Sequence, residues 1–269
     1  MSSARSRAST LLAGLLAVTA WAEPSGTSDD PEPLDPVEPT ATSSANHQRL
    51  ETPRGALHLY RPAGFSSETA GTVIYVHGYY TSVDDAWTDH ALARQFDASG
   101  RNALFVVPEA PRGDDEAVRW PSLEQLLAAV EREGGLEIPA GPLVVVAHSG
   151  GFRSLQGWLD SGKVDGVVLL DGLYGAESEL ARWLDQGGNH PGSLVLVGAD
   201  TTRRIERFVQ RCGDYSELAS VPVTPESRED GERVIFLRSP YGHMQMVTEG
   251  RVIAPLLRLM RLRDVGHAR

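Results

Sequence analysis

The segment Leu143–Gly151 constrains this chain more than any other part of its sequence. A continuous apolar run, Leu143–Ala147, leads through one residue to Ser149, which two glycines follow. A strand that turns sharply into a helix at a serine holds that serine in strained backbone geometry, so the residues two before and two after it must be small. Ala147 and Gly151 meet this requirement. The segment after the turn is apolar at helical spacing, at Phe152, Leu155, Trp158 and Leu159.

Matches to small-x-Ser-x-Gly are common by chance, and such a serine can simply stand in a tight turn. The setting of strand, turn and helix favours a nucleophile elbow, with Ser149 as the nucleophile. With this elbow the chain resembles the α/β-hydrolase superfamily, with alanine in place of the usual first glycine. The resemblance implies a catalytic serine, acid and histidine, in the chain order Ser, Asp, His.

The same resemblance implies an oxyanion loop after an earlier strand. The apolar segment Thr72–Val76 ends at His77, which a glycine follows. The backbone N–H of Tyr79, or alternatively that of Tyr80, would then face the N–H of Gly150. Such donors stabilise the negative charge that develops during acyl transfer by about 3–4 kcal/mol each. We expect His77 to tie the loop down rather than to take part in the chemistry.

A serine hydroxyl is a poor nucleophile at neutral pH and needs a general base. His243 is the candidate, because it follows the last expected strand, Val234–Leu237, through a short turn-rich loop. The superfamily carries its histidine at this place, near the end of the chain. A lone histidine in a loop is more often solvated, but none of the other histidines follows that strand.

Two aspartates compete for the role of the acid. Asp171 stands directly at the end of the strand Val167–Leu170, and Asp200 comes three residues after the strand Ser193–Val197. Most of the superfamily uses the later strand, and some lipases use the earlier one. The acid must be buried and fixed to orient the histidine. A strand-end position favours Asp171, and Asp200 also fits the N-cap of the following helix; both remain candidates.

Residues 1–22 resemble a secretory signal peptide. Arg5 and Arg7 precede the apolar stretch Leu11–Val18, and the small-x-small site Ala20–Ala22 follows. The apolar stretch is short for a bilayer span. We therefore expect an exported, periplasmic or secreted bacterial protein without an integral membrane segment after cleavage. A cleavage junction without cysteine argues against a lipid anchor.

Residues 23–48 are expected to be a disordered acidic linker, because they are rich in Pro, Ser and Thr and contain no Lys or Arg. The domain then spans residues 49–269. Its only cysteine, Cys212, excludes an intramolecular disulfide and is expected to be an idle thiol.

Within the domain, strand and helix patterns alternate. This alternation predicts an α/β fold, a doubly wound, mostly parallel sheet with helices on both faces. The expected strands are Ala56–Tyr60, Thr72–Val76, Ala103–Val107, Leu143–Ala147, Val167–Leu170, Ser193–Val197 and Val234–Leu237. The expected helices are Asp85–Ala98, a segment from Ser122 to Gly134, Phe152–Asp160, Ala176–Gln186, Thr202–Arg211 and Ile253–Leu262.

Net charge and the absence of cofactor motifs exclude several classes of function. The chain has 269 residues, of which 41% are hydrophobic, and a net charge of −11. Phosphate binding needs a basic surface, so nucleic acid is not an expected partner. The sequence carries no glycine-rich nucleotide motif and no convincing set of metal ligands, so neither a cofactor nor a metal is expected.

The connection Gly172–Gly192 leaves room for a small cap at most, so the site should be open to a small-molecule or polymeric ester or amide substrate. Tyr80 and Tyr174, with Tyr79 and Tyr241, are candidates to line the pocket, and each could equally be packing.

Three functions remain open: an exported serine hydrolase that cleaves an ester or amide through an acyl-enzyme, an acyltransferase on the same scaffold, and a non-catalytic binding module of the cell envelope. The last is possible because fold alone does not imply function. The joint presence of serine, histidine, aspartate and oxyanion glycines favours an enzyme.

Overall fold

The structure is a computed structural model that describes residues 47–186, 192–222 and 233–266. The chain divides into two units, Met1–Thr40 and Ala41–Arg269. The expected signal peptide and most of the expected linker lie outside the described residues. The architecture below is that of the second unit.

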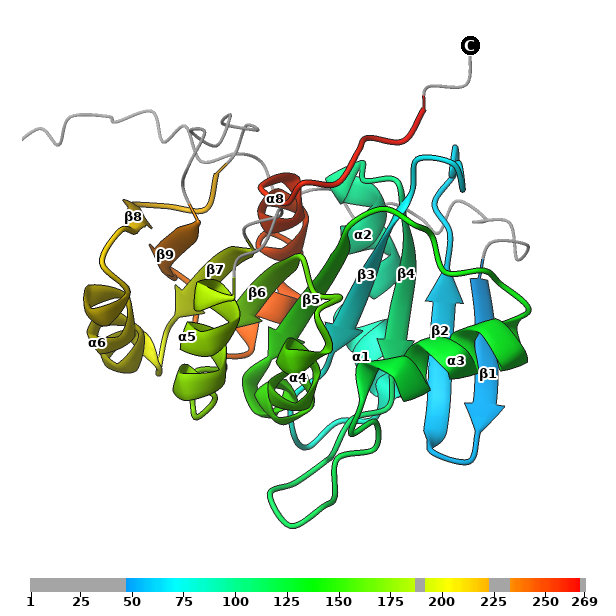
Figure 1. Ribbon diagram of the computed structural model, residues 1–269, viewed down its shortest axis with the longest axis horizontal. Helices are drawn as coiled ribbons and strands as arrows, with labels where there is room; N and C mark the ends of the chain where they lie inside the picture. The colour runs from blue at the N-terminus through cyan, green and yellow to red at the C-terminus, as the bar shows by residue number, and fades with distance from the viewer. Residues whose placement is uncertain (1–46, 187–191, 223–232, 267–269) are drawn as a thin grey trace, which may run out of the picture. The chain divides into compact units, whose positions relative to one another are not determined.

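The second unit is built on one sheet (Figure 1). Its strands lie in the order β1-β2-β4-β3-β5-β6-β7-β9-β8, and all neighbours from β4 to β8 pair in parallel, whereas β1–β2 and β2–β4 are antiparallel. The strand bounds are β1 His47–Thr52, β2 Gly55–Tyr60, β3 Gly71–Val76, β4 Ala103–Pro108, β5 Leu143–His148, β6 Gly166–Leu170, β7 Ser193–Gly198, β8 Ser216–Leu218 and β9 Val234–Arg238.

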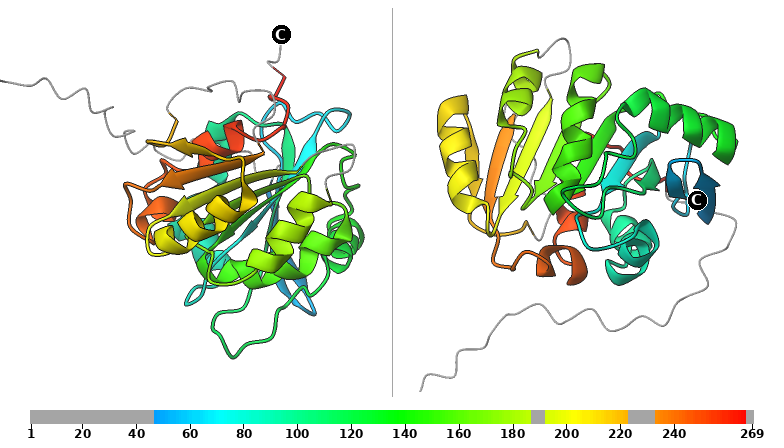
Figure 2. Two further views of the ribbon diagram at one scale, coloured as in Figure 1. Left: turned by 60° about the vertical axis from the view of Figure 1, so that its left-hand side comes forward. Right: turned by 90° about the horizontal axis from the view of Figure 1, so that it is seen from below.

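Helices cover both faces of this sheet, as Figure 2 shows from below. One face packs against α3 Leu123–Gly134, α4 Phe152–Trp158, α5 Glu177–Asp185 and α6 Thr202–Cys212. The other packs against α1 Val83–Asp89, α2 Leu92–Ser99, α7 Gln245–Thr248 and α8 Ile253–Arg258. The predicted fold class, a mostly parallel sheet between two helical layers, is confirmed.

The central strands are predominantly apolar because both of their faces are buried. Every residue of β3, β5 and β7 is buried. Successive side chains of a strand point to opposite faces, so in β3 Ile74 and Val76 join the core under α3 and α4, whereas Val73 and Tyr75 join the core under α2 and α8.

Several elements differ from the sequence expectation. The strands β1, which begins at His47, and β8, and the short helix α7, were not expected. The expected single helix Asp85–Ala98 is two helices, because Ala91 adopts a left-handed conformation (φ 45°) after His90, whose buried ring bonds the Tyr75 hydroxyl. The predicted start of α3 is confirmed, since the Ser122 hydroxyl accepts the Gln125 N–H.

The connections at the carboxyl ends of β3, β5, β6, β7 and β9 meet at one edge of the sheet, where open α/β sheets bind their ligands. The cap is small: between Gly172 and Gly192 the described residues contain one helix, α5. No helix in the described ranges is long and apolar enough to cross a membrane.

Candidate active site

Ser149 occupies a sharp turn between β5 and α4. Its backbone is left-handed (φ 51°), a conformation that non-glycine residues rarely adopt. The neighbouring glycines permit close approach: a Cβ on Gly151 would lie 2.7 Å from the Val76 carbonyl oxygen, and one on Gly78 would lie 2.8 Å from the Ser149 Cβ. The turn therefore has the geometry of a nucleophile elbow packed against the loop after β3.

His243 approaches this serine from the loop after β9. Its Nε2 lies 2.9 Å from the Ser149 Oγ, and its Nδ1 lies 2.6 Å from the Asp171 Oδ2. The loop is anchored at its base by the Ser239 N–H, which donates to the Gly198 carbonyl. The buried ring of His148 also holds the loop, because its Nε2 lies 3.1 Å from the His243 carbonyl oxygen.

Asp171 is fully buried at the end of β6, again with a left-handed backbone (φ 42°). Its Oδ1 accepts hydrogen bonds from the N–H of Ala199 and from both the N–H and the hydroxyl of Thr201, and its Oδ2 accepts the Asp200 N–H. Burial alone would raise the pKa of this carboxyl, but the bonds from His243, Thr201 and Ala199 outweigh burial and hold the pKa well below its usual range. Asp171 is therefore ionised at neutral pH.

Asp200, the other candidate acid, is exposed, and its carboxylate makes no hydrogen bond to His243. One of its oxygens comes within 4.8 Å of the nearest ligand atoms of Asp171 and His243. Asp200 is not the N-cap of α6 either, because that position is Thr201. The structure thus brings Asp171, and not Asp200, into contact with the histidine.

The charges around His243 favour its protonated form. The hydrogen bond to Asp171 raises the pKa of His243, burial lowers it, and the charges of Asp171 and Asp200 raise it further, with a net increase. His148 behaves in the opposite way, because burial and the nearby His243 lower its pKa to about 3. His148 therefore stays neutral while it holds the His243 loop.

The oxyanion loop places Tyr79 next to the elbow. A Cβ on Gly150 would lie 2.4 Å from the Tyr79 ring, so that ring covers the Gly150 backbone. The Tyr80 N–H donates to the Arg112 carbonyl at 3.0 Å and is not free to bind an oxyanion, whereas within the described ranges no acceptor pairs with the Tyr79 N–H. Of the two alternatives left by the sequence, the geometry favours Tyr79 with Gly150.

His77 ties this loop to its neighbour. Its Nε2 accepts the Ala110 N–H at 3.0 Å, so the ring proton is on Nδ1, which donates to the Gly78 carbonyl at 2.8 Å. Both ring nitrogens have backbone partners, in agreement with the structural role expected for this residue.

Two of the tyrosines expected to line the pocket are exposed. Tyr80 is 93% exposed and has a left-handed backbone (φ 64°), and Tyr174 is 43% exposed, with its ring 6.4 Å from the His243 ring. Burial and the charges of Asp171 and Asp200 raise the pKa of Tyr174 to about 12, so it remains a neutral phenol. The Tyr80 ring lies 6.4 Å from the Tyr79 ring, whereas Tyr241 packs partly buried against the core.

Sequence reasoning missed His148 and Thr201. His148 was visible inside the elbow, but nothing in the sequence shows that its ring reaches the His243 carbonyl. Thr201 supplies two of the donors to Asp171. Its role depends on how the turn after β7 folds back toward β6.

Among the described residues, one group of possible metal ligands was found, formed by Asp171, Asp200 and His243. Two of its members already bond each other at 2.6 Å, and Asp171 accepts four further donors. A metal ion would have to displace these bonds, so we assign no metal to this group.

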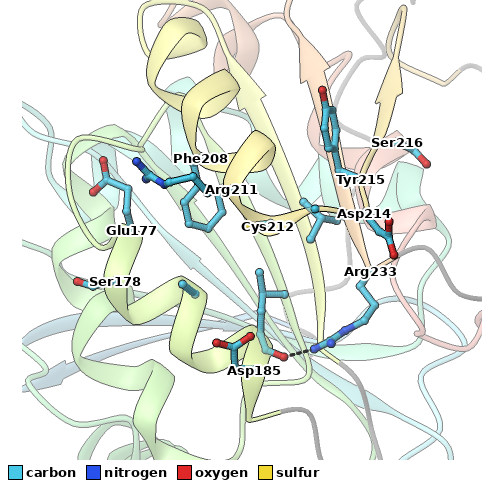
Figure 3. A pocket seen from close by; sticks show the side chains of 14 residues that line it. Glu177, Ser178, Asp185, Phe208, Arg211, Cys212, Asp214, Tyr215, Ser216 and Arg233 are labelled. Carbon is cyan, nitrogen blue, oxygen red and sulfur yellow. Dashed lines mark hydrogen bonds between the residues drawn. The ribbon is translucent and has the colours of Figure 1, made fainter.

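A separate cavity of about 950 Å³ lies between α5 and α6 (Figure 3). Phe208, Cys212 and Arg233 line it, and the Arg233 guanidinium donates to the Leu184 carbonyl. Burial raises the pKa of the Cys212 thiol, which keeps it protonated and unreactive. None of Ser149, His243 and Asp171 lines this cavity.

No protein-family model and no curated protein matches this sequence. Solved structures match its fold. A mutant of the feruloyl esterase module from Clostridium thermocellum, complexed with sinapinate, is similar over 83% of this chain and 90% of its own, with 11% identity and a TM-score of 0.54. The S-formylglutathione hydrolase from Agrobacterium tumefaciens is similar over 81% of this chain and 95% of its own, with 11% identity and a TM-score of 0.53. The substrate-bound fluorophosphonate-binding serine hydrolase F of Staphylococcus aureus is similar over 80% of this chain and 97% of its own, with 10% identity and a TM-score of 0.52.

These proteins belong to the α/β-hydrolase superfamily. At such low identities the likeness establishes the fold, and the chain has the α/β-hydrolase fold that its elbow motif predicts.

The acid can be tested by a matched pair of variants. Asp171→Asn should fold but lower kcat by a factor on the order of 10⁴. The three donors at Oδ1 hold the amide oxygen there, so the amide N–H₂ faces His243 and selects the wrong imidazole tautomer. Asp200→Asn should change kcat less than about tenfold, since it breaks no hydrogen bond to the histidine. Steady-state ester hydrolysis measures both, and a larger loss in the Asp200 variant would reverse the assignment.

Asp200 should instead affect the pH profile. His243 acts as a base only when neutral, so activity is lost as the pH falls through its pKa, and the Asp200 charge raises that pKa. Asp200→Asn should therefore move the acidic limb of kcat/KM to lower pH. The difference should shrink at 1 M salt, which screens an exposed charge. Coincident profiles at low salt would contradict this coupling.

Proposed function

We propose that this protein is an exported serine hydrolase that cleaves an ester or amide bond through a covalent acyl-enzyme. Ser149 attacks the carbonyl carbon, His243 removes the serine proton at Nε2, and Asp171 orients the imidazole. The observation that carries the proposal is the unbroken hydrogen-bonded series from the Ser149 Oγ through His243 to Asp171, at 2.9 and 2.6 Å.

The proposed chemistry has two halves. In the first, the tetrahedral intermediate places its negative oxygen between the N–H groups of Tyr79 and Gly150, and His243 returns the proton to the leaving group. In the second, a water molecule bound at the vacated position gives its proton to His243 and attacks the acyl carbon, which releases the acid and restores Ser149. The small cap leaves the site open to this water.

Two further observations support an enzyme over a binding module. Strained backbone at both Ser149 and Asp171 is a cost that a binding module has no reason to keep, because strained residues cluster at active sites. The solved structures with the same fold carry the names of an esterase and of hydrolases. The substrate we propose is a small ester, and transfer of the acyl group to an alcohol instead of water is the alternative outcome of product analysis.

The nucleophile can be tested by covalent labelling. A fluorophosphonate should modify Ser149 at one site per chain, because the reagent traps a serine activated by an adjacent histidine. Ser149→Ala should fold as the wild type does and take up no label. Intact-mass spectrometry measures both. Full labelling of the alanine variant would show that another residue is the nucleophile, and a wild type that neither labels nor hydrolyses esters would favour the binding module.

Export can be tested at the N-terminus. We propose that residues 1–22 are removed during secretion and that the mature chain begins at Glu23 without a lipid, because the site after Ala22 has small residues and no cysteine. N-terminal sequencing of periplasmic or secreted material should begin at Glu23. Material beginning at Met1 would refute the proposal.

A further inference from the structure

Arg153 lies one turn after the nucleophile, near the start of α4, and its guanidinium bonds only to oxygens of other segments. Nη1 donates to the carbonyl oxygens of Gly113 and Asp114, both at 3.1 Å, and Nη2 donates to that of Glu116 at 2.9 Å. A fourth bond runs from Nη1 to the Tyr79 hydroxyl at 3.3 Å. Arg153 is paired with no carboxylate among the described residues, so its charge is directed at backbone carbonyls.

Those carbonyls belong to the long loop that connects β4 to α3 and projects from the edge of the sheet where the parallel strands end (Figure 1). The loop enters the core at Pro111 and again at Trp120, and no residue between them is fully buried. Apolar burial therefore cannot hold the middle of the loop. Within the loop, the Glu116 N–H donates to the Gly113 carbonyl and the Glu116 carboxylate accepts the Arg112 N–H. Arg153 adds three bonds from outside the loop that tie residues 113–116 to α4, because a guanidinium presents several donors in a rigid plane.

The same loop holds the oxyanion segment. The Arg112 carbonyl accepts the Tyr80 N–H at 3.0 Å, and Arg112 itself is fixed by its Nε bond to Glu109 at 3.0 Å. The Tyr79 ring, whose hydroxyl meets Arg153, lies against the Gly150 backbone. Arg153 is therefore linked to the proposed oxyanion segment in two ways. It bonds the Tyr79 hydroxyl directly, and it bonds the loop whose Arg112 carbonyl accepts the Tyr80 N–H.

We propose that Arg153 is a positioning residue for the oxyanion hole. The inference rests on the proposed hydrolase function and adds a residue that the triad does not include. Arg153 fixes the direction of the Tyr79 N–H and, through the 113–116 loop, the left-handed conformation of Tyr80. Its effect on the transition state is indirect, because the N–H groups of Tyr79 and Gly150, and not its own side chain, bind the oxyanion.

The kinetic test compares Arg153→Met, Arg153→Lys and Tyr79→Phe with the wild type, using the small ester p-nitrophenyl acetate as substrate. Arg153→Met should lower kcat about 10–100-fold with KM changed less than about threefold, because a small displacement of an oxyanion donor affects the transition state more than binding. Arg153→Lys should be intermediate, since an ammonium keeps the charge but not the planar set of donors. Tyr79→Phe should lose several-fold at most.

Arg182→Met is the matched control. Arg182 is an exposed arginine on α5 that pairs with Asp160 at the surface, so its loss should leave kcat unchanged. A wild-type kcat in Arg153→Met, or an increase in KM alone, would overturn the inference. The fluorophosphonate labelling rate should fall in parallel with kcat, because phosphonylation places charge in the same hole.

A second readout does not depend on catalysis. Hydrogen–deuterium exchange followed by mass spectrometry should show faster exchange at the Tyr80 amide and across residues 112–116 in Arg153→Met, by about tenfold or more, while β5 and β6 exchange as in the wild type. Unchanged exchange in the loop would overturn the inference even if the protein proved not to be a hydrolase. If Arg153→Met exchanges faster throughout the chain, that variant is unfolded. The same measurement on Arg153→Lys then tests the inference: faster exchange confined to the Tyr80 amide and residues 112–116 supports it, and unchanged exchange there overturns it.

Discussion

The Asp171 carboxylate is the interaction on which the rest of the site depends. It accepts three N–H groups and one hydroxyl from the turn after β7, as well as the ring of His243 from the loop after β9. A buried charge is unfavourable unless it is hydrogen-bonded, and this one meets that condition with donors from two other strand ends. The same bonds that keep it ionised also fix the position of His243 relative to Ser149.

Backbone strain is also found at the edge of the sheet that carries the site. Five described non-glycine residues have a left-handed backbone, and three of them lie at the site edge of the sheet: Ser149 and Asp171 directly after β5 and β6, and Tyr80 in the loop after β3. The other two, Ala91 and Ala176, precede α2 and α5. Such conformations persist only where surrounding contacts determine them. The contacts here are the glycine approaches at the elbow, the donors to Asp171 and the Arg112 carbonyl that holds Tyr80. At these three residues, strain and its compensation thus lie in the loops that carry the proposed chemistry.

The sequence predicted what local patterns determine. The central strands are unbroken apolar runs, and the elbow is a spacing of small residues around Ser149, so both could be predicted without a structure. The choice between Asp171 and Asp200 could not, because it depends on the backbone N–H groups of residues 199–201 turning toward β6. The split between α1 and α2 was missed for a similar reason, since it depends on a long-range bond from Tyr75 to His90.

Electrostatics explains why a second histidine can lie beside the first. His148 is buried with its ring 4.8 Å from that of His243, and two protonated rings at this distance would repel strongly. Burial keeps His148 neutral, so it contributes a donor to the His243 carbonyl without a competing charge. In the proposed mechanism His243 becomes positive only when it takes the serine proton, and the carboxylate that faces it is already ionised and fully hydrogen-bonded. The site is thus organised for a charge pair that exists during the reaction, with no rearrangement of its polar groups required when that charge develops.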